Sequence, residues 1–154
     1  METRKLELKD IAGNLPYKMC VYDKAQENYF EYAIDSEWSI CQVLDDDLLF
    51  PILYPFDQID KPMIHNGKKI VPIVELAKIA YPDRNWKYSK KLKQSVYGCH
   101  LFEFRKGGFN SDFWTMQNQY QLFDYLHELK IDYRGLIDTG LAISVYDLKE
   151  NPYG

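Results

Sequence analysis

The sequence has few cysteines and no long apolar run, and both absences exclude classes of protein. Its three cysteines, Cys20, Cys41 and Cys99, are an odd number with no close pair, which argues against a disulfide framework and a zinc knuckle. The longest apolar stretches, such as 48–55, are far shorter than the roughly 20 residues that cross a bilayer. The sequence also opens without the apolar core of a signal peptide. We therefore expect a soluble, cytoplasmic protein with reduced thiols and no membrane contact.

Recognisable cofactor and catalytic motifs are also missing. The glycine pair at 107–108 follows two cations, but it lacks the Lys-Ser/Thr ending and the strand-loop-helix context of a phosphate-binding loop. The acidic triplet 45–47 has no EF-hand spacing and is expected to be a solvated loop. None of the spacings typical of metal-binding pairs occurs among the histidines, which are His65, His100 and His127. We therefore predict no cofactor, no metal and no catalytic residue.

One neighbouring thiol and imidazole keep an enzymatic alternative open. Cys99 and His100 are adjacent, and a nucleophilic cysteine needs a base, which His127 or His65 would supply. In a strand, however, adjacent side chains face opposite sides, so Cys99 and His100 cannot serve one site without a bulge. We interpret Cys99 as a buried thiol beside a histidine at the rim. A cryptic enzyme using Cys99, His100 or His127 is retained as an alternative.

The chain does contain enough apolar material for a core. It has 154 residues, of which 46% are hydrophobic and 16% aromatic, including 13 tyrosines. This length fits one domain or two small lobes, and the composition excludes wholesale disorder. Tyrosine buries a ring and keeps a polar edge, so the tyrosines fit either the rim of a core or a contact surface.

Charge is sorted along the sequence. Residues 25–60 carry nine carboxylates and no Lys or Arg, whereas 84–106 carry seven cations and one acid, Glu103. The net charge of -4 is therefore -9 in the first stretch, +6 in the second and -1 elsewhere. The acidic stretch, with Tyr29, Tyr32 and Trp38, is suited to a basic protein partner. The alternative is that it forms the solvated face of a small sheet.

The basic stretch mixes cations with aromatic rings, which is typical of a groove for single-stranded nucleic acid. The alternative is a solvated connection between lobes, anchored to the core by Trp86 and Tyr88. The sequence pI of about 5.4 favours that alternative. The candidate binding residues are Arg84, Trp86, Lys87, Tyr88, Lys90, Lys91, Lys93, Arg105 and Lys106.

The first half of the chain reads as short strands separated by polar turns. Alternating or β-branched runs predict strands, and Pro51 places its strand at a sheet edge. A single helical turn or plain turn is expected at 10–14. The expected strands are 5–8, 18–22, 29–34, 39–44 and 48–53.

In the second half, Asn66-Gly67 predicts a tight hairpin turn, and Pro72 predicts the start of a helix over 72–80. Residues 96–105 read as one strand. A main helix is expected over 114–130, with an apolar face of Met116, Tyr120, Phe123, Leu126 and Leu129. A short helix over 133–139 capped by Gly140, and a strand over 141–146, complete the chain.

These elements predict an α+β fold. We expect a small antiparallel β-rich N-terminal lobe over 1–82, a meander or partly open barrel that ends in a short helix. It packs as one compact unit with a C-terminal α+β lobe over 83–154, built on the main helix. The expected core residues are Leu15, Val21, Phe30, Val43, Leu53, Val74, Phe102, Phe123, Leu126, Leu136 and Ile143.

Several stretches together resemble a group of uncharacterised small phage and prophage proteins of Bacteroides and related gut bacteria. They cover about two thirds of the chain: LELKDIAGNLPYKMCVYD, FPILYPFDQI, NGKKIVPIVELAKIAYPD and QLFDYLHELKIDYRGLIDTGLAISVYDL. The resemblance implies a phage-encoded protein in the cytoplasm of a bacterial host cell. It implies no activity and no site residues.

Sequence and resemblance together favour a non-enzymatic binding or accessory protein that contacts a host or phage macromolecule. An unidentified protein partner is the first expectation, and single-stranded nucleic acid bound through 84–106 is the alternative. A homodimer and a monomer both stay open.

Overall fold

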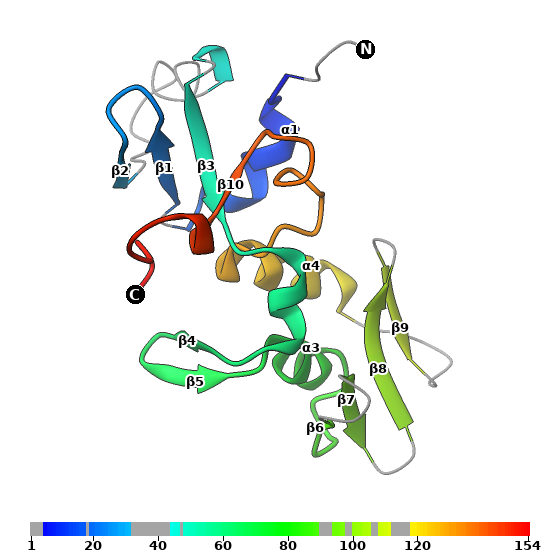
Figure 1. The fold of residues 1–154 in the computed structure, drawn as a ribbon. Coiled ribbons are helices and arrows are strands. Elements are labelled where there is room, and N and C mark those ends of the chain that lie inside the picture. The colour runs from blue at the N-terminus through cyan, green and yellow to red at the C-terminus, as the bar shows by residue number, and fades with distance from the viewer. Residues whose placement is uncertain are drawn as a thin grey trace. The chain divides into compact units, whose positions relative to one another are not determined.

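A computed structural model describes residues 5–17, 19–31, 44–46, 48–89, 94–97, 100–105, 108–111 and 118–154 (Figure 1). Helices and strands are both present, which confirms the α+β class. The chain divides into two compact units. Unit 1 combines 1–56 with 127–154, and unit 2 consists of 57–126. The expected boundary at 82/83 therefore falls inside unit 2.

Unit 1 begins with a helical turn where the sequence pattern suggested a strand over 5–8. Helix α1 (Leu8–Ile11) continues into the 3-10 helix η1 (Ala12–Asn14). The Asp10 carboxylate accepts a hydrogen bond from the Glu7 amide at 2.9 Å, which closes a capping box. This local cap outweighs the short alternation of 5–8, and the expected turn at 10–14 is confirmed.

The sheet of unit 1 has the strand order β10-β3-β1-β2. Its strands are β1 (Cys20–Asp23), β2 (Asn28–Glu31), β3 (Leu49–Leu53) and β10 (Ile143–Ser144). β1 pairs antiparallel with β2 and β3, and β10 pairs parallel to β3. The strands expected over 18–22 and 48–53 are thus present. The strand expected over 29–34 is present as β2 up to Glu31, and 32–34 lie outside the described residues. Of the strand expected over 39–44, residues 39–43 lie outside the described residues as well.

Pro51 lies in an inner strand, so its expected place at a sheet edge is wrong. Lys24 N donates to Leu48 O at 2.9 Å, and antiparallel pairs alternate between bonded and non-bonded. Pro51, opposite Val21, is therefore a non-bonded position whose missing N–H faces β10. The β10 pairing begins only at Ile52, so the proline removes no hydrogen bond from the sheet.

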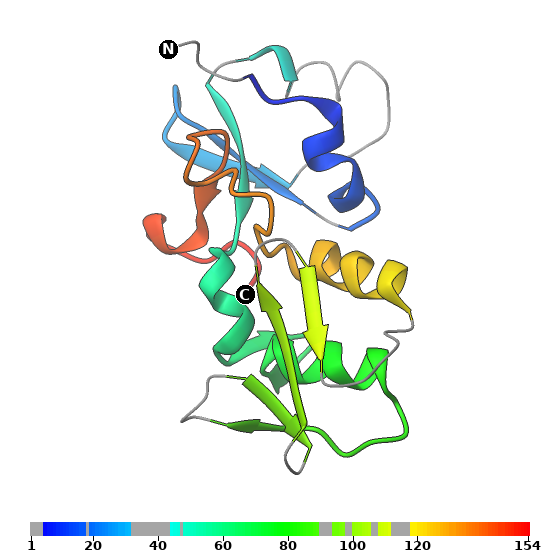
Figure 2. The same ribbon diagram turned by 90° about the vertical axis from the view of Figure 1, so that its right-hand side faces the viewer.

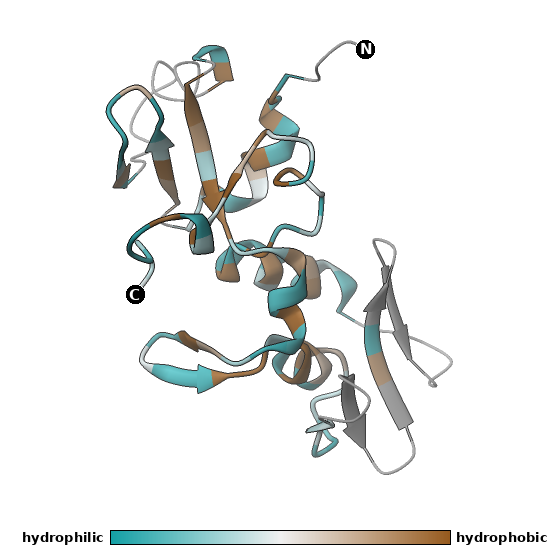
Figure 3. Ribbon diagram, viewed as in Figure 1, coloured by the Kyte–Doolittle hydropathy of each residue, from teal (hydrophilic) through white to brown (hydrophobic). Residues whose placement is uncertain are grey.

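The core of unit 1 gathers along β3 and the segments beside it, and Figure 3 shows β3 as largely hydrophobic. The predicted core residues Val21, Leu53 and Leu136 are buried. Leu15 and Ile143 are partly buried, and Val43 lies outside the described residues. Phe30 is 42% exposed, because every side chain of β2 faces solvent to a large extent. The core cluster comprises Leu6, Ile11, Met19, Val21, Leu49, Leu53, Leu136, Leu141 and Ala142.

The short helix expected over 133–139 is instead a series of turns. The buried Asp132 carboxylate accepts hydrogen bonds from Leu136 N at 2.9 Å and Ile137 N at 2.8 Å. Gly135 has a φ of 76°, which interrupts any helix at that point. Gly140 has a φ of 77°, so its left-handed conformation is confirmed.

Unit 2 contains the predicted hairpin and the predicted helix. β4 (Met63–His65) and β5 (Lys68–Ile70) pair antiparallel around Asn66 and Gly67, whose φ values are 50° and 77°. Two positive φ values are the mark of the hairpin turn that Asn-Gly favours. Helix α3 (Pro72–Ala80) follows with Pro72 in its first turn. A 3-10 helix, η2 (Phe56–Asp60), precedes the hairpin.

A four-stranded antiparallel meander packs against α3 in unit 2. Its order is β6 (Lys87–Ser89), β7 (Gln94–Tyr97), β8 (His100–Arg105) and β9 (Gly108–Ser111). The single strand expected over 96–105 is therefore wrong, because β7 and β8 pair with each other, Tyr97 opposite His100. The predicted core residues Val74 and Phe102 are buried.

Helix α4 (Gln119–Leu129) confirms the main helix from residue 119 onward, while 114–117, including Met116, lie outside the described residues. Its buried residues are Leu122, Leu126 and Leu129, whereas Tyr120 is 84% exposed and Phe123 is half-buried. The apolar face is therefore rotated away from the predicted Tyr120. None of the helices in the described ranges has the length and apolar character needed to traverse a bilayer.

Candidate functional site

The basic segment 84–106 forms strands of unit 2, since β6, β7 and β8 all lie within it. Trp86 is only 2% exposed. Its ring centroid lies 6.1 Å from that of Tyr81 and 6.0 Å from that of Phe102. A ring in this position packs the core and is not presented to a nucleic-acid base. The placement agrees with the interpretation that Trp86 anchors this segment.

The other candidate residues of this segment are only partly described. The Arg84 guanidinium pairs with the Asp83 carboxylate at 3.1 Å and lies 5.7 Å from the centre of the Tyr81 ring. Lys87 is exposed, and burial together with the charge of Asp60 raises the pKa of Tyr88. Arg105 is described as the last residue of β8. The remaining candidates lie outside the described residues: Lys90, Lys91, Lys93 and Lys106.

The residues of the enzymatic alternative are also divided between described and undescribed parts. Cys99 lies outside the described residues, and His100 is described as the first residue of β8. His127 is hydrogen-bonded through Nε2 to the Tyr133 hydroxyl, and its ring packs against Gly13. Among the residues that the structure describes, no three His, Cys, Asp or Glu side chains gather as a metal site.

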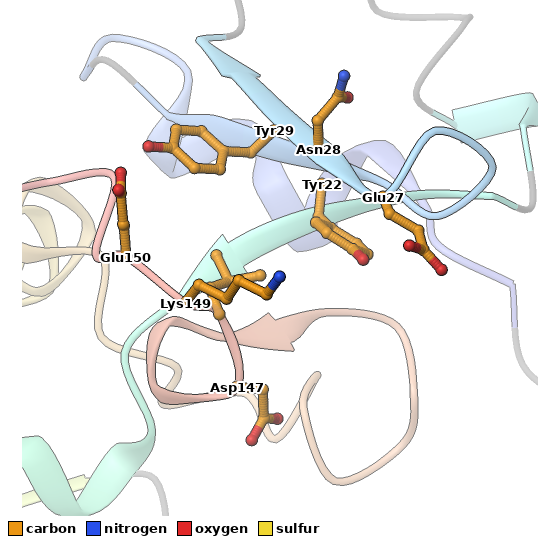
Figure 4. A pocket seen from close by; sticks show the side chains of 8 residues that line it. Tyr22, Glu27, Asn28, Tyr29, Asp147, Lys149 and Glu150 are labelled. Atoms are coloured by element: carbon orange, nitrogen blue, oxygen red, sulfur yellow. The ribbon is translucent and has the colours of Figure 1, made fainter.

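A pocket of about 410 Å³ lies in unit 1, between the β1–β2 hairpin and the segment after β10 (Figure 4). One wall comes from the hairpin, and the other from the segment 145–154, which we call the strap. Figure 4 shows Tyr22 of β1 and Lys149 of the strap near the centre, with Glu27 on one side and Glu150 on the other. The lining residues are Tyr22, Glu27, Asn28, Tyr29, Asp147, Leu148, Lys149 and Glu150.

The hairpin wall is shaped by a turn that the sequence encodes locally. The Asp23 carboxylate accepts hydrogen bonds from Ala25 N at 3.0 Å and from Gln26 N at 3.4 Å. Glu27 then takes a φ of 54°, a left-handed conformation that returns the chain into β2. This turn places Glu27 in the wall of the pocket, next to Asn28 and Tyr29.

The strap wall is held by a cap and by contacts from its far end. Ser144 Oγ accepts a hydrogen bond from Tyr146 N at 3.1 Å and starts the 3-10 helix η3 (Val145–Asp147). Beyond the pocket residues, Asn151 donates to the Tyr54 hydroxyl at 2.8 Å. Tyr153 donates to Ile52 O at 2.7 Å and accepts from Cys20 N at 2.8 Å. Figures 1 and 2 show the strap beside the carboxyl end of β3.

Burial shifts the pKa values of Tyr153 and of two titratable groups beside it, Cys20 and Lys130. Burial raises the pKa of the Tyr153 phenol and, with the charge of Glu31 adding to it, raises the pKa of the Cys20 thiol. Burial lowers the pKa of Lys130, whose ammonium lies 4.9 Å from the centre of the Tyr153 ring. A protonated thiol is a weak nucleophile, so this cluster favours a structural role.

The charge of the pocket is negative. Glu27, Asp147 and Glu150 supply three carboxylates against the single cation Lys149. Within the described ranges, none of these four side chains forms an ion pair. The rings of Tyr22 and Tyr29 add aromatic surface. Carboxylates beside aromatic faces attract a cation, above all a guanidinium, which accepts both kinds of contact.

The sequence did not predict this pocket, and none of its lining residues belongs to the candidate set in 84–106. Glu27 belongs to the acidic stretch, and Tyr29 was one of the rings expected to accompany it. The strap half was not predicted, because 147–150 lies far from 25–60 in the sequence and has an ordinary composition. The run Asp147-Leu148-Lys149-Glu150 carries no motif, and it is brought to the hairpin by the pairing of β10 with β3 before it and by the Tyr153 contacts after it.

Comparisons with known proteins give no further guide to this pocket. The chain matches no family model, no curated protein and no solved structure. The fold and the pocket geometry of the chain itself are therefore the basis for any functional proposal.

Proposed function

We propose that this protein is a non-enzymatic binding protein that captures a basic segment of a partner protein in the pocket of unit 1. The observation that carries the proposal is the meeting of two tyrosine rings and three carboxylates, which form no ion pair with any described residue, around a space of about 410 Å³. One arginine or lysine side chain can enter such a space, and its neighbours in the partner can meet the surrounding acids. The acidic stretch of the sequence supports the same kind of partner.

A protein partner fits this pocket better than a nucleic acid does. Phosphates would be repelled by Glu27, Asp147 and Glu150, whereas an arginine-rich protein segment would be attracted. Such a partner can itself be a nucleic-acid-binding surface, which the acidic pocket would then cover. The proposed setting, a phage-encoded accessory protein in a bacterial cytoplasm, rests on the sequence resemblance alone.

The proposal is tested by the binding of a fluorescent oligo-arginine peptide, measured by anisotropy at low and moderate salt. Glu27→Gln combined with Glu150→Gln should weaken binding about tenfold, because each exposed pair contributes up to about 1 kcal/mol and no new clash is introduced. The matched control is Asp57→Asn with Asp83→Asn, which removes the same charge from unit 2.

Two outcomes would count against the proposal. Equal weakening by the pocket variant and by the control would show that the peptide senses only net charge. Tighter binding of a single-stranded oligonucleotide than of the peptide, lost on Lys90→Glu with Lys91→Glu, would favour the basic segment instead.

A further inference from the structure

The Tyr153 hydroxyl occupies the place of a hydrogen bond between two strands. It accepts from Cys20 N at 2.8 Å and donates to Ile52 O at 2.7 Å. Cys20 and Ile52 belong to β1 and β3, which pair directly over 21–23 and 49–51. One side-chain oxygen therefore bridges the two strands where their own pairing ends.

The register shows what this oxygen replaces. Because β1 and β3 are antiparallel, each step forward along β1 is matched by a step back along β3: Val21 lies opposite Pro51, and Tyr22 lies opposite Phe50. Continuing this register puts Cys20 opposite Ile52. The bond from Lys24 N to Leu48 O marks every second pair as bonded, and Cys20 with Ile52 belongs to that set. In an uninterrupted sheet, Cys20 N would donate directly to Ile52 O.

The inserted hydroxyl is also the anchor of the strap. Tyr153 N donates to Asn151 Oδ1 at 2.9 Å, and Asn151 in turn donates to the Tyr54 hydroxyl. The Tyr153 ring lies 6.0 Å from that of Tyr54, and the Lys130 ammonium lies 4.9 Å from its centre. Apart from these contacts, the strap residues between Asp147 and Glu150 are mainly exposed and line the pocket.

We propose that Tyr153 is a latch with two positions, inserted between β1 and β3 with the pocket complete, or withdrawn with the sheet closed directly from Cys20 to Ile52. In the withdrawn position, both backbone groups stay hydrogen-bonded, because each becomes the other's partner. Withdrawal therefore leaves neither the Cys20 amide nor the Ile52 carbonyl unsatisfied, which would otherwise oppose it strongly. The strap wall of the pocket leaves with Tyr153. This regulatory role rests on the function proposed above.

A partner bound in the pocket would hold the latch inserted. Its contacts with Asp147 and Glu150 exist only while the strap is seated, so it binds one position in preference to the other. By linkage, the population of the inserted position rises with the partner, and the affinity for the partner falls wherever the latch is withdrawn.

The test measures the backbone hydrogen bond itself in the protein without a bound partner. A long-range HNCO spectrum reports the coupling between the Cys20 amide and the Ile52 carbonyl carbon, which is visible only when they are directly hydrogen-bonded. We expect no coupling in the wild type and a clear coupling in Tyr153→Ala. Tyr153→Phe, which keeps the ring, should show it together with faster amide exchange in the strap. Tyr146→Phe, an exposed tyrosine of the same strap, is the matched control and should behave as the wild type.

Absence of the coupling in Tyr153→Ala, with the amide signals of β2 and β3 unchanged, would contradict the proposed latch. The sheet would then be folded, yet Cys20 N would not have formed the direct hydrogen bond to Ile52 O. A rise of Cys20 amide exchange in that variant would overturn it as well. These readings need no ligand, so they are independent of the peptide experiment. If both proposals hold, Tyr153→Ala should also bind the oligo-arginine peptide about tenfold more weakly, an effect of the size expected when one anchoring group is removed.

Discussion

Gly13 lies where any side chain would collide with the imidazole ring of His127. The contact is tight because Asn14, the next residue, donates through Nδ2 to His127 O at 2.9 Å and holds η1 against the helix end. We expect Gly13→Ala to lower the free energy of unfolding by about 1–3 kcal/mol, as overpacking of a filled site does. Denaturant titration followed by circular dichroism measures this change.

A double-mutant cycle separates this collision from other effects of the substitution. If the methyl group acts by striking the ring, Gly13→Ala should cost much less in a His127→Ala background. A cost that is the same in both backgrounds would place the effect in the backbone of η1.

Tyr153 gives the stability of the protein a defined dependence on pH. Burial raises the pKa of its phenol, and Cys20, Lys130 and Tyr54 are the titratable groups that face it. The folded state therefore binds the phenol proton more tightly than the unfolded state does. The contribution of the Tyr153 phenol to the free energy of unfolding is complete below the ordinary tyrosine pKa of about 10. This contribution is lost as the pH rises above that value.

The wild type should accordingly lose more unfolding free energy than Tyr153→Phe when the pH is raised above about 10. The lowered pKa of Lys130 works in the opposite direction, because deprotonation of this side chain favours folding. Parallel pH profiles for the two proteins would contradict this role of Tyr153.

Residues with a local conformational reason were predictable from the sequence. Asn66-Gly67 and Gly140 have the expected positive φ values, because few side chains tolerate that region. Phe30 and Tyr120 were not predictable. Both are apolar by composition, and both are exposed, since their burial depends on what covers β2 and α4 and not on the residues themselves.

Among the elements, α3 is the one whose sequence and packing agree most fully. Its buried residues are Pro72, Ile73, Val74, Leu76, Ala77 and Ala80, and it packs on the strands of unit 2. Leu76 is fully buried. We expect Leu76→Ala to destabilise the protein by about 2–5 kcal/mol through the cavity it leaves.

The matched control on the same helix is Lys78→Ala, which shortens an exposed side chain paired with Glu75 at 3.3 Å and should cost less than about 1 kcal/mol. Hydrogen exchange resolved by peptide should place the main loss of protection from Leu76→Ala in 57–126. Similar losses for the two variants would show that α3 does not pack as described.

Strand pairing was the part of the element pattern that the sequence could not supply. Residues 96–105 alternate well enough for one strand, yet β7 and β8 separate between Tyr97 and His100 and pair with each other. Pro51 has no backbone N–H to donate, but whether this weakens the sheet depends on which neighbouring strand its nitrogen faces. That direction follows from register, and register is a property of two strands together.

At the scale of the whole molecule, the division into units joins distant parts of the chain. Unit 1 takes residues from both sides of unit 2, so no boundary read along the sequence could describe it. The same holds for the pocket, which the sequence did not predict: Glu27, Asn28 and Tyr29 in its hairpin wall belong to the acidic stretch, and its strap wall comes from a distant part of the chain. Contacts between 22–29 and 147–150 depend on the parallel pairing of β10 with β3, which carries no local signal.

Because unit 1 consists of two segments separated by unit 2, its strands are synthesised at different times. A ribosome delivers β1, β2 and β3 first, then all of unit 2, and only then β10 and Tyr153. When β1 and β3 first meet, no hydroxyl is yet available to separate Cys20 from Ile52, and the two strands can close on each other. The nascent chain would thus reach the closed sheet before the inserted one, and Tyr153, which is translated after β1 and β3, would have to open a bond that these strands had already made.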